Sequence, residues 1–224
     1  PLAGNKLARE KSDRSPVTDA DEEAEGLILA MLASHFPGVP VVAEEEAAAG
    51  RVAAVSERFF LVDPLDGTKE FLSGNGEFTV NIAEIEHGVP VAGAVYAPAR
   101  ARLFFGGAGM AFENGNAIAA RLPARDGLVA VGSRSHGDAA TDAFLKRWPV
   151  KSMLGIGSSL KFCLVAAGEA DIYARGGPTM EWDTAAGHAV LLAAGGRVEN
   201  WSGAPLLYGK PGFKNPAFVA FGKR

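Results

Sequence analysis

The segment that most constrains the fold of this chain follows a short apolar run. Phe59 to Val62 has the length and composition of a buried β-strand, and the next six residues are Asp63-Pro64-Leu65-Asp66-Gly67-Thr68. Because Pro64 has no N–H for a strand ladder, we expect the strand to end there. Gly67 permits a backbone conformation that lets the chain turn back. The sequence therefore predicts a strand that ends in a tight, acidic turn.

This turn has the ligand types of a metal site. The carboxylates of Asp63 and Asp66 can converge there, with the Leu65 carbonyl between them. Hard oxygen ligands of this kind suit Mg²⁺. The turn thus predicts a magnesium site at the end of a buried strand.

Two further segments place carboxylates beside apolar elements. Glu44 to Glu46 follows the strand candidate Val41 to Ala43, and Trp182 to Gly187 opens a strongly apolar helix. Each cluster by itself is more simply explained as an acidic turn, an N-cap or a solvated face. Three clusters with the same placement favour one shared site.

The composition is that of a globular protein and narrows the partners. A chain of 224 residues with 48% hydrophobic content buries a substantial core, as one large or two closely packed domains. A net charge of −4 and the lack of a Lys/Arg run argue against a nucleic-acid polymer or an anionic membrane surface as partner. The single cysteine, Cys163, forms no internal disulfide, which favours a reducing, cytoplasmic compartment. We expect neither an integral membrane segment nor a signal peptide.

The apolar pattern changes along the chain and predicts two lobes. Thr18 and Asp21 form a capping-box pattern ahead of a helix from 19 to 35. An antiparallel meander is expected in the strand runs 59–62, 78–85, 91–96, 103–105 and 110–112. An α/β lobe is expected from strands at 128–131, 170–174 and 217–221 and helices at 138–147, 159–167 and 184–194. We therefore expect two packed lobes, residues 1–125 and 126–224.

Motifs spread in order over nearly the whole chain resemble those of a known family. The three carboxylate segments resemble the signatures of the inositol monophosphatase superfamily, which are Mg²⁺-dependent, lithium-sensitive phosphatases. Five further segments resemble its CysQ-type branch, the bacterial 3′(2′),5′-bisphosphate nucleotidases of sulfur metabolism: Asp13 to Thr18, Lys69 to Phe71, Asn75 to Ile82, Ser133 to His136 and Gly157 to Cys163. The resemblance implies an α/β (α+β) protein, the layered αβαβα sandwich of the inositol monophosphatase and fructose-1,6-bisphosphatase type, with the active site between the lobes.

The resemblance also bears on the chain's extent and assembly. Members of the family usually carry one more helix ahead of the motif at Asp13, so we expect an N-terminal segment to be missing from a chain that begins at Pro1. A monomer and a homodimer both stay open. So does a peripheral position at the inner face of the membrane, beside a purely cytoplasmic one.

The family pattern implies two or three Mg²⁺ ions per site. Glu44, Asp63 and the Leu65 carbonyl would hold one ion. Asp63, Asp66 and Asp183 would hold another, so that Asp63 bridges the two.

The resemblance assigns the attacking water to Asp13 with Thr68, whose hydroxyl would relay between the carboxylate and the water. Without the resemblance, Asp13 is better explained as a turn residue. Glu45 would either position a water or hold Thr68 in place. The backbone N–H groups of Gly67 and Thr68 are candidates for binding phosphate.

Four residues match positions that contact the nucleotide and its non-scissile phosphate in the nucleotidase branch: His136, Ser158, Lys161 and Arg175. A surface loop explains His136 equally well. Lys161 stands among apolar neighbours, where either a phosphate contact or a snorkelling side chain accounts for it. Arg175 has a planar guanidinium suited to bidentate phosphate contact.

The leading hypothesis is a phosphatase that converts adenosine 3′,5′-bisphosphate to AMP and phosphate. An inositol or sugar monophosphatase is the alternative within the enzyme class, and Lys69-Glu70 favours the nucleotidase form over the Thr-Asn usual in the inositol enzymes. A non-catalytic ion- or nucleotide-binding module is the alternative outside it. That module would be favoured if a metal ligand were missing, and all of them are present.

Overall fold

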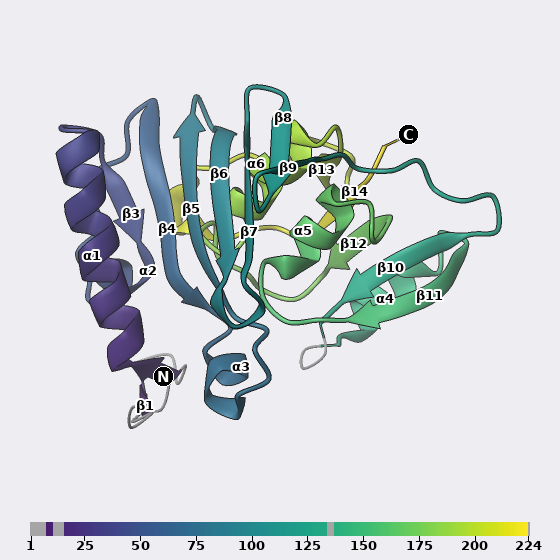
Figure 1. Ribbon diagram of the computed structural model, residues 1–224, viewed down its shortest axis with the longest axis horizontal. Coiled ribbons are helices and arrows are strands. Elements are labelled where there is room, and N and C mark those ends of the chain that lie inside the picture. The colour runs from purple at the N-terminus through teal and green to yellow at the C-terminus, as the bar shows by residue number, and fades with distance from the viewer. Residues whose placement is uncertain (1–7, 11–15, 134–136, 224) are drawn as a thin grey trace.

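Helices and sheets alternate in five layers (Figure 1). The computed structural model describes residues 8–10, 16–133 and 137–223. The layers are, in order, helix α1 (Asp19–His35), a seven-stranded sheet, helices α5 (Leu160–Ala166) and α6 (Ala185–Ala193), a five-stranded sheet, and helix α4 (Ala139–Leu145). The expected αβαβα sandwich is confirmed.

The seven-stranded sheet contains the predicted meander. Its order is β3 (Val41–Ala43), β4 (Arg58–Asp66), β5 (Thr79–Glu86), β6 (Val89–Ala97), β7 (Arg102–Gly107), β8 (Met110–Glu113) and β9 (Asn116–Ile118). Strands β3 and β4 are parallel, and every later pair is antiparallel. Each strand expected between residues 59 and 112 is present.

Strand β4 corrects one expectation, because it does not end at Pro64. The ladder with β5 pairs Asp63 with Asn81 and resumes where Asp66 pairs with Thr79. Pro64 and Leu65 thus oppose a single residue of β5, which is a bulge. The missing N–H of proline interrupts the ladder without stopping the strand, so both aspartates stay on β4.

The five-stranded sheet has the order β11 (Val150–Gly155), β10 (Leu128–Gly132), β12 (Ile172–Arg175), β14 (Phe218–Phe221) and β13 (Arg197–Asn200). β10 runs parallel to β11 and β12, whereas β14 is antiparallel to β12 and β13. The three strands and three helices expected after residue 125 are present. The sequence prediction missed the two edge strands, β11 and β13.

Short elements complete the fold. Asp21 accepts hydrogen bonds from the Thr18 N–H at 2.8 Å and from its hydroxyl, so α1 begins at the predicted capping box. The short elements are β1 (Ala8–Glu10) paired with β2 (Pro16–Thr18), α2 (Glu44–Ala48), α3 (Thr68–Ser73) and the 3₁₀ turns η1 (Pro98–Arg100) and η2 (Pro211–Phe213).

The main hydrophobic core lies between the two sheets, around α5 and α6. Helix α6 comes from the second half of the chain but packs on β5, β6 and β7. A Cβ at Gly93 of β6 would lie 2.6 Å from the Ala186 carbonyl oxygen, so glycine is required for this close approach. Cys163 is fully buried in the same core, as expected of a structural thiol. The boundary near residue 125 stays a prediction, since α6 joins the two halves.

Across the residues that the structure describes, no helix combines the length and the apolar character needed to cross a membrane.

Candidate active site

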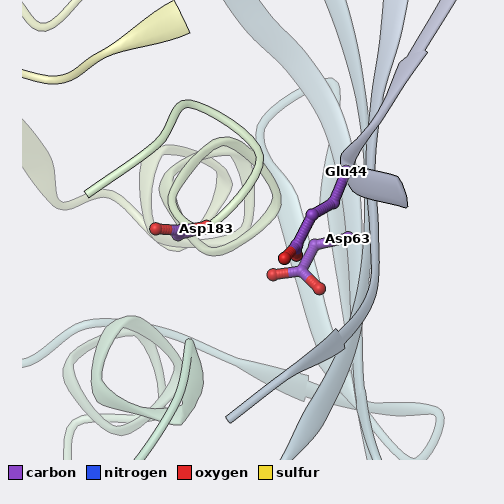
Figure 2. Close-up of side chains that lie close together, drawn as sticks. All are labelled: Glu44, Asp63 and Asp183. Atoms are coloured by element: carbon purple, nitrogen blue, oxygen red, sulfur yellow. The ribbon is translucent and has the colours of Figure 1, made fainter. Parts of the chain in front are cut away.

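Three carboxylates from separate segments meet between the sheets (Figure 2). Glu44 begins α2 directly after β3, Asp63 lies in β4, and Asp183 precedes α6. Each offers an oxygen that lies within 4.8 Å of the others. Because β3 and β4 are parallel neighbours, Glu44 and Asp63 emerge at the same edge of the sheet. Asp183 faces this pair from the other side (Figure 2).

The negative charges of this group repel one another. Burial raises the pKa of Asp63 well above its ordinary value, and the negative charges of Glu44, Asp66 and Asp183 raise it further. Burial, followed by the charge of Asp66, likewise raises the pKa of Asp183 well above its usual range. A divalent cation relieves both penalties, and carboxylate oxygens are the ligands that Mg²⁺ prefers. The residues present therefore fit the metal that the family resemblance implies.

Glu44 is held in place by a residue that the sequence analysis missed. The carboxylate of Glu25, on α1, accepts hydrogen bonds from the N–H groups of Glu45 and Glu46, both at 2.8 Å. N–H groups at the first turn of a helix have no partner within the helix, and Glu25 satisfies these two, so it fixes the start of α2. The sequence did carry a signal for Glu25. It lies one helical turn after the capping Asp21 and therefore on the same, buried face of α1.

The bulge shapes the Asp63 side of the site. Asp63 Oδ1 accepts a hydrogen bond from the Leu65 N–H at 3.0 Å, and the Thr68 hydroxyl lies 3.5 Å from the Leu65 carbonyl oxygen. Gly67 has a φ of +94°, and a Cβ there would lie 3.3 Å from the Glu77 carbonyl oxygen. The predicted turn at Gly67 thus exists and begins α3 at Thr68.

Asp66 stands beside the three-carboxylate group rather than within it. Its Oδ2 accepts a hydrogen bond from the Ser159 N–H at 2.6 Å. Burial raises its pKa, whereas the positive charge of Lys161 and hydrogen bonds from Ser159 and Asn81 oppose that rise. The sequence analysis assigned Glu44 and Asp63 to one ion, and Asp63, Asp66 and Asp183 to another. The structure brings Glu44, Asp63 and Asp183 together, and the role of Asp66 as a metal ligand is still a prediction.

A cavity of about 230 Å³ adjoins the carboxylates. Asp66 and Asp183 line one part of it. Every described residue predicted to contact substrate also lines it: Gly67, Thr68, Ser158, Lys161 and Arg175. The sequence analysis did not assign several other lining residues, among them Glu70, Ser133, Ser159, Tyr173, Thr179 and Thr184.

Lys161 is buried and points into this cavity rather than snorkelling to the outer surface. Its Nζ donates a hydrogen bond to the Ser158 carbonyl oxygen at 2.5 Å and lies 5.4 Å from the centre of the Tyr173 ring. Burial lowers its pKa to about 8, although the charge of Asp66 opposes the shift. The lysine is thus a buried cation whose charge is only partly compensated by nearby carboxylates such as Asp66.

Arg175 is the second cation of the cavity. Its Nη2 donates a long hydrogen bond, 3.5 Å, to the Pro178 carbonyl oxygen. Its buried Nε has no hydrogen-bond partner in the described part of the chain. Ser158, which also lines the cavity, has a φ of +51°, a strained conformation for a residue with a side chain. The cavity lining thus includes both a strained residue and an unused donor.

Three predicted residues stay without a structural test. Asp13 and His136 lie outside the described residues, so the pairing of Asp13 with Thr68 is still a prediction. Glu45 lies in α2 beside Glu44, and its role in holding a water or Thr68 is likewise still a prediction.

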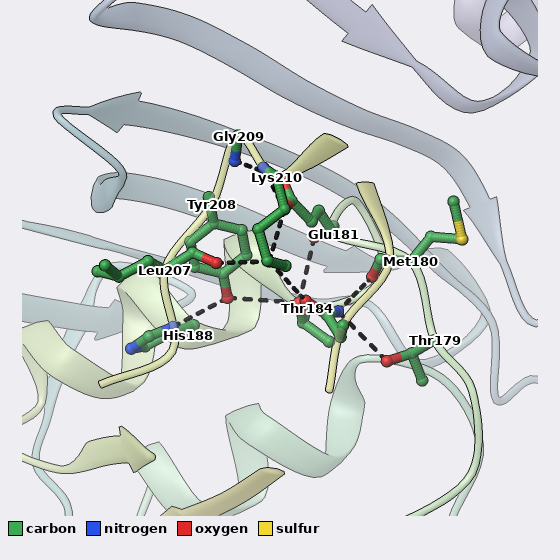
Figure 3. A network of polar contacts seen from close by, with 10 residues as sticks. Thr179, Met180, Glu181, Thr184, His188, Leu207, Tyr208, Gly209 and Lys210 are labelled. Carbon is green, nitrogen blue, oxygen red and sulfur yellow. Dashed lines mark hydrogen bonds and ion pairs between the residues drawn. The ribbon is translucent and has the colours of Figure 1, made fainter. Parts of the chain in front are cut away.

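A buried polar network supports the segment that carries Asp183 (Figure 3). The fully buried Glu181 accepts hydrogen bonds from the N–H groups of Gly209 and Lys210, at 2.7 and 3.0 Å. His188 Nδ1 lies 2.9 Å from the Tyr208 hydroxyl, and burial lowers the pKa of His188 to about 3. The network ties residues 179–184 to the C-terminal part of the chain, and His188 serves it as a neutral, structural histidine.

The fold and the site define the class of protein: a layered α/β enzyme in which a group of three carboxylates, suited to a metal, adjoins a cavity lined by acidic and basic side chains. The chain belongs to the inositol monophosphatase family, whose model matches residues 2–218. It is therefore a phosphatase.

Similar proteins narrow the kind of phosphatase further. The 3′(2′),5′-bisphosphate nucleotidase CysQ of Escherichia coli K12 is 48% identical over 93% of this chain and 86% of its own length. The crystal structure of CysQ from Bacteroides thetaiotaomicron is 38% identical and superposes with a TM-score of 0.78, covering 95% of this chain and 87% of its own. An inositol monophosphatase from Zymomonas mobilis is 25% identical with a TM-score of 0.80, over 99% of this chain and 85% of its own. The resemblance to the CysQ branch is confirmed.

Proposed function

We propose that this protein is a Mg²⁺-dependent 3′(2′),5′-bisphosphate nucleotidase that hydrolyses the 3′-phosphate of adenosine 3′,5′-bisphosphate to give AMP and phosphate. The observation that carries the proposal is the cavity itself, which is lined both by the carboxylates of Asp66 and Asp183 and by the cations Lys161 and Arg175. A substrate with two phosphates matches both a metal site and a pair of cations. The names of the CysQ relatives support the same substrate.

Glu44, Asp63 and Asp183 would hold Mg²⁺, with Asp66 and the Leu65 carbonyl as further ligands for a second or third ion. When bound, the metal supplies charge neutralisation at the scissile phosphate and a more acidic water. The bulge in β4 is what presents Asp63 and Asp66 from one strand.

The remaining groups bind and orient. Thr68 at the start of α3 would orient the attacking water, with Asp13 accepting its proton and Glu45 supporting this arrangement. The N–H groups of Gly67 and Thr68 would bind the scissile phosphate, since Gly67 lets the backbone approach closely.

The basic end would bind the second phosphate. Lys161 supplies a point charge, and Arg175 supplies donors that lack good partners in the described residues. Ser158 and His136 would add contacts to the nucleotide. A buried cation with unused donors gains most from an anion that enters the cavity.

Phosphate release from a substrate panel tests the proposal. We expect the highest kcat/KM with adenosine 3′,5′-bisphosphate, less with the 2′,5′ isomer and least with inositol 1-phosphate and 3′-AMP, which lack the second phosphate. Activity should vanish with EDTA, return with Mg²⁺ and fall in millimolar lithium, as is typical of the family. A preference for inositol 1-phosphate would instead support the inositol monophosphatase alternative, to which the Zymomonas structure points.

A further inference from the structure

Ser159 makes three short contacts that join the two sides of the active site. Its N–H donates to Asp66 Oδ2 at 2.6 Å, and its hydroxyl donates to the Asp183 carbonyl oxygen at 2.6 Å. The same hydroxyl accepts a hydrogen bond from Asn81 Nδ2 at 3.0 Å. One residue thus contacts two proposed metal ligands that lie 117 positions apart in the sequence, at 66 and 183.

The partners come from different layers of the fold. Asn81 lies in β5 of the seven-stranded sheet, where it pairs with Asp63. Ser159 directly precedes α5, and Asp183 directly precedes α6. Ser159 and Asn81 are 2% and 1% exposed, so water does not compete for these hydrogen bonds. The contacts therefore fix how far the first sheet stands from the start of α6.

The direction of each hydrogen bond is determined. The Asp183 carbonyl oxygen only accepts, so the Ser159 hydroxyl must donate to it and then accepts from the Asn81 amide. This orientation leaves the buried Asn81 Oδ1 without a hydrogen-bond partner among the described residues. A buried unsatisfied oxygen is destabilising. The Asn81 amide thus donates to Ser159 in an orientation that leaves its own oxygen unpaired among the described residues.

The carboxylates need such a constraint. The negative charge of Asp66 makes ionisation of Asp183 less favourable and contributes to its raised pKa. Like charges on separate elements move apart unless the elements are tied together. Asp183 is tied on its other side, where its Oδ2 accepts a hydrogen bond from the Met180 N–H at 2.8 Å.

We propose that Ser159 and Asn81 are positioning residues, which act through Asp66 and Asp183 to set the spacing of the metal ligands and hence the affinity for Mg²⁺. This inference rests on the proposed Mg²⁺ site. Groups that orient metal ligands typically contribute 10–100-fold to metal affinity, on the order expected here.

The experiment measures Mg²⁺ binding without turnover. Mg²⁺ is titrated by calorimetry into metal-free wild type, Ser159→Ala and Asn81→Ala. Ser159→Ala removes the hydroxyl with its contacts to Asp183 and Asp66 but keeps the N–H that donates to Asp66. Asn81→Ala removes the amide contacts to Ser159 and Asp66 and leaves the bond from Ser159 to Asp183. We expect the Kd for Mg²⁺ to rise about 10–100-fold in Ser159→Ala and less in Asn81→Ala. The double variant should be no weaker than Ser159→Ala alone, because both changes break one chain of contacts.

Turnover then separates positioning from a general loss of structure. The Mg²⁺ concentration for half-maximal rate should rise with the Kd, whereas kcat at saturating Mg²⁺ should recover most of the wild-type value. The matched control is Ser202→Ala, whose hydroxyl donates to Asn200 in a turn remote from the cavity. It should bind Mg²⁺ as wild type does.

The experiment distinguishes failure of the proposed function from failure of the positioning role. A wild-type protein that does not bind Mg²⁺ would overturn the proposed function. A wild type that binds, with either folded variant binding equally tightly, would overturn the positioning role alone. Should Ser159→Ala fail to fold, Asn81→Ala still decides the question.

Discussion

The acidic and the basic groups of the site differ in charge, but burial shifts the pKa of both toward the neutral form. At the acidic end, burial and mutual repulsion raise the pKa of Asp63 and Asp183. At the basic end, burial lowers the pKa of Lys161 to about 8. In both cases burial makes the charged form of the side chain less stable than it is in water. Each end is therefore built for a ligand of opposite charge: a metal cation at one and a phosphate at the other.

The ends also differ in how firmly they are held. Backbone N–H groups of Leu65 and Met180 donate to the carboxylates of Asp63 and Asp183. Arg175 makes, among the described residues, one long hydrogen bond, to the Pro178 carbonyl oxygen. The acidic end is thus fixed before any ligand binds, whereas the basic end is completed by its ligand. We expect changes at the acidic end to abolish chemistry and changes at the basic end to alter substrate preference.

The largest effect should come from Asp183→Asn. The change removes an anionic ligand while keeping an oxygen that accepts from the Met180 N–H. We expect kcat/KM to fall at least about 10³-fold on every substrate, more than the 10–100-fold typical of groups that only orient ligands. Steady-state phosphate release at limiting and at saturating Mg²⁺ measures it. Wild-type turnover at limiting Mg²⁺ would show that Asp183 is not a metal ligand.

Arg175→Ala should have a smaller and selective effect. Loss of a charge-assisted hydrogen bond is expected to cost about 1.5–3 kcal/mol in kcat/KM toward adenosine 3′,5′-bisphosphate. Inositol 1-phosphate, with no second phosphate, should be hydrolysed almost as before. Arg125→Ala, on an exposed loop, is the control and should change neither substrate. An equal loss on both substrates would place Arg175 at the scissile phosphate or in a structural role.

Asp63→Asn should uncouple stability from metal binding. A raised pKa means that the folded state binds more protons than the unfolded state between the ordinary carboxyl pKa and the raised one. The stability of the metal-free protein therefore falls as pH rises through that window. Removing the charge should raise the metal-free melting temperature at pH 7.5 by about 2–4 °C for each kcal/mol relieved.

The same melting experiments contain the control. Mg²⁺ should raise the melting temperature of the wild type but not that of Asp63→Asn. If the metal-free variant melts at or below wild type at neutral pH, the carboxylate group is not under the electrostatic strain that the structure indicates.

The smallest effect concerns Lys161. Its pKa of about 8 means that it is charged below this pH and neutral above it. As pH rises through about 8, the KM for adenosine 3′,5′-bisphosphate should increase several-fold, on the order expected for one lost charge–phosphate contact. Inositol 1-phosphate should not show this inflection, and Lys161→Arg should remove it. An inflection of equal size for both substrates would assign it to the metal site.

Local patterns predicted most of the elements. The capping residues Thr18 and Asp21 located the start of α1, and short strand-like runs located β5 to β8. The edge strand β11 was missed because its residues are mostly exposed and carry no alternation. It forms a strand because β10, which precedes it in the chain across α4, offers an edge for parallel pairing.

By itself the sequence determined the chemistry of the acidic end. Asp63 and Asp66 flank the bulge, and Gly67 adopts a φ that only glycine takes without strain. Residue identity and short-range geometry suffice for such a feature. These properties come from within a few positions of one strand.

Only the tertiary structure decided which groups meet and how deeply they are buried. It brought Glu44, Asp63 and Asp183 within 4.8 Å of one another, buried the cation Lys161, and tied the two sides together through Ser159. Distances and dehydration of this kind arise from packing two sheets around α5 and α6. No pattern within one segment encodes the position of a second segment a hundred residues away, because that position is set by the sum of all contacts in the core.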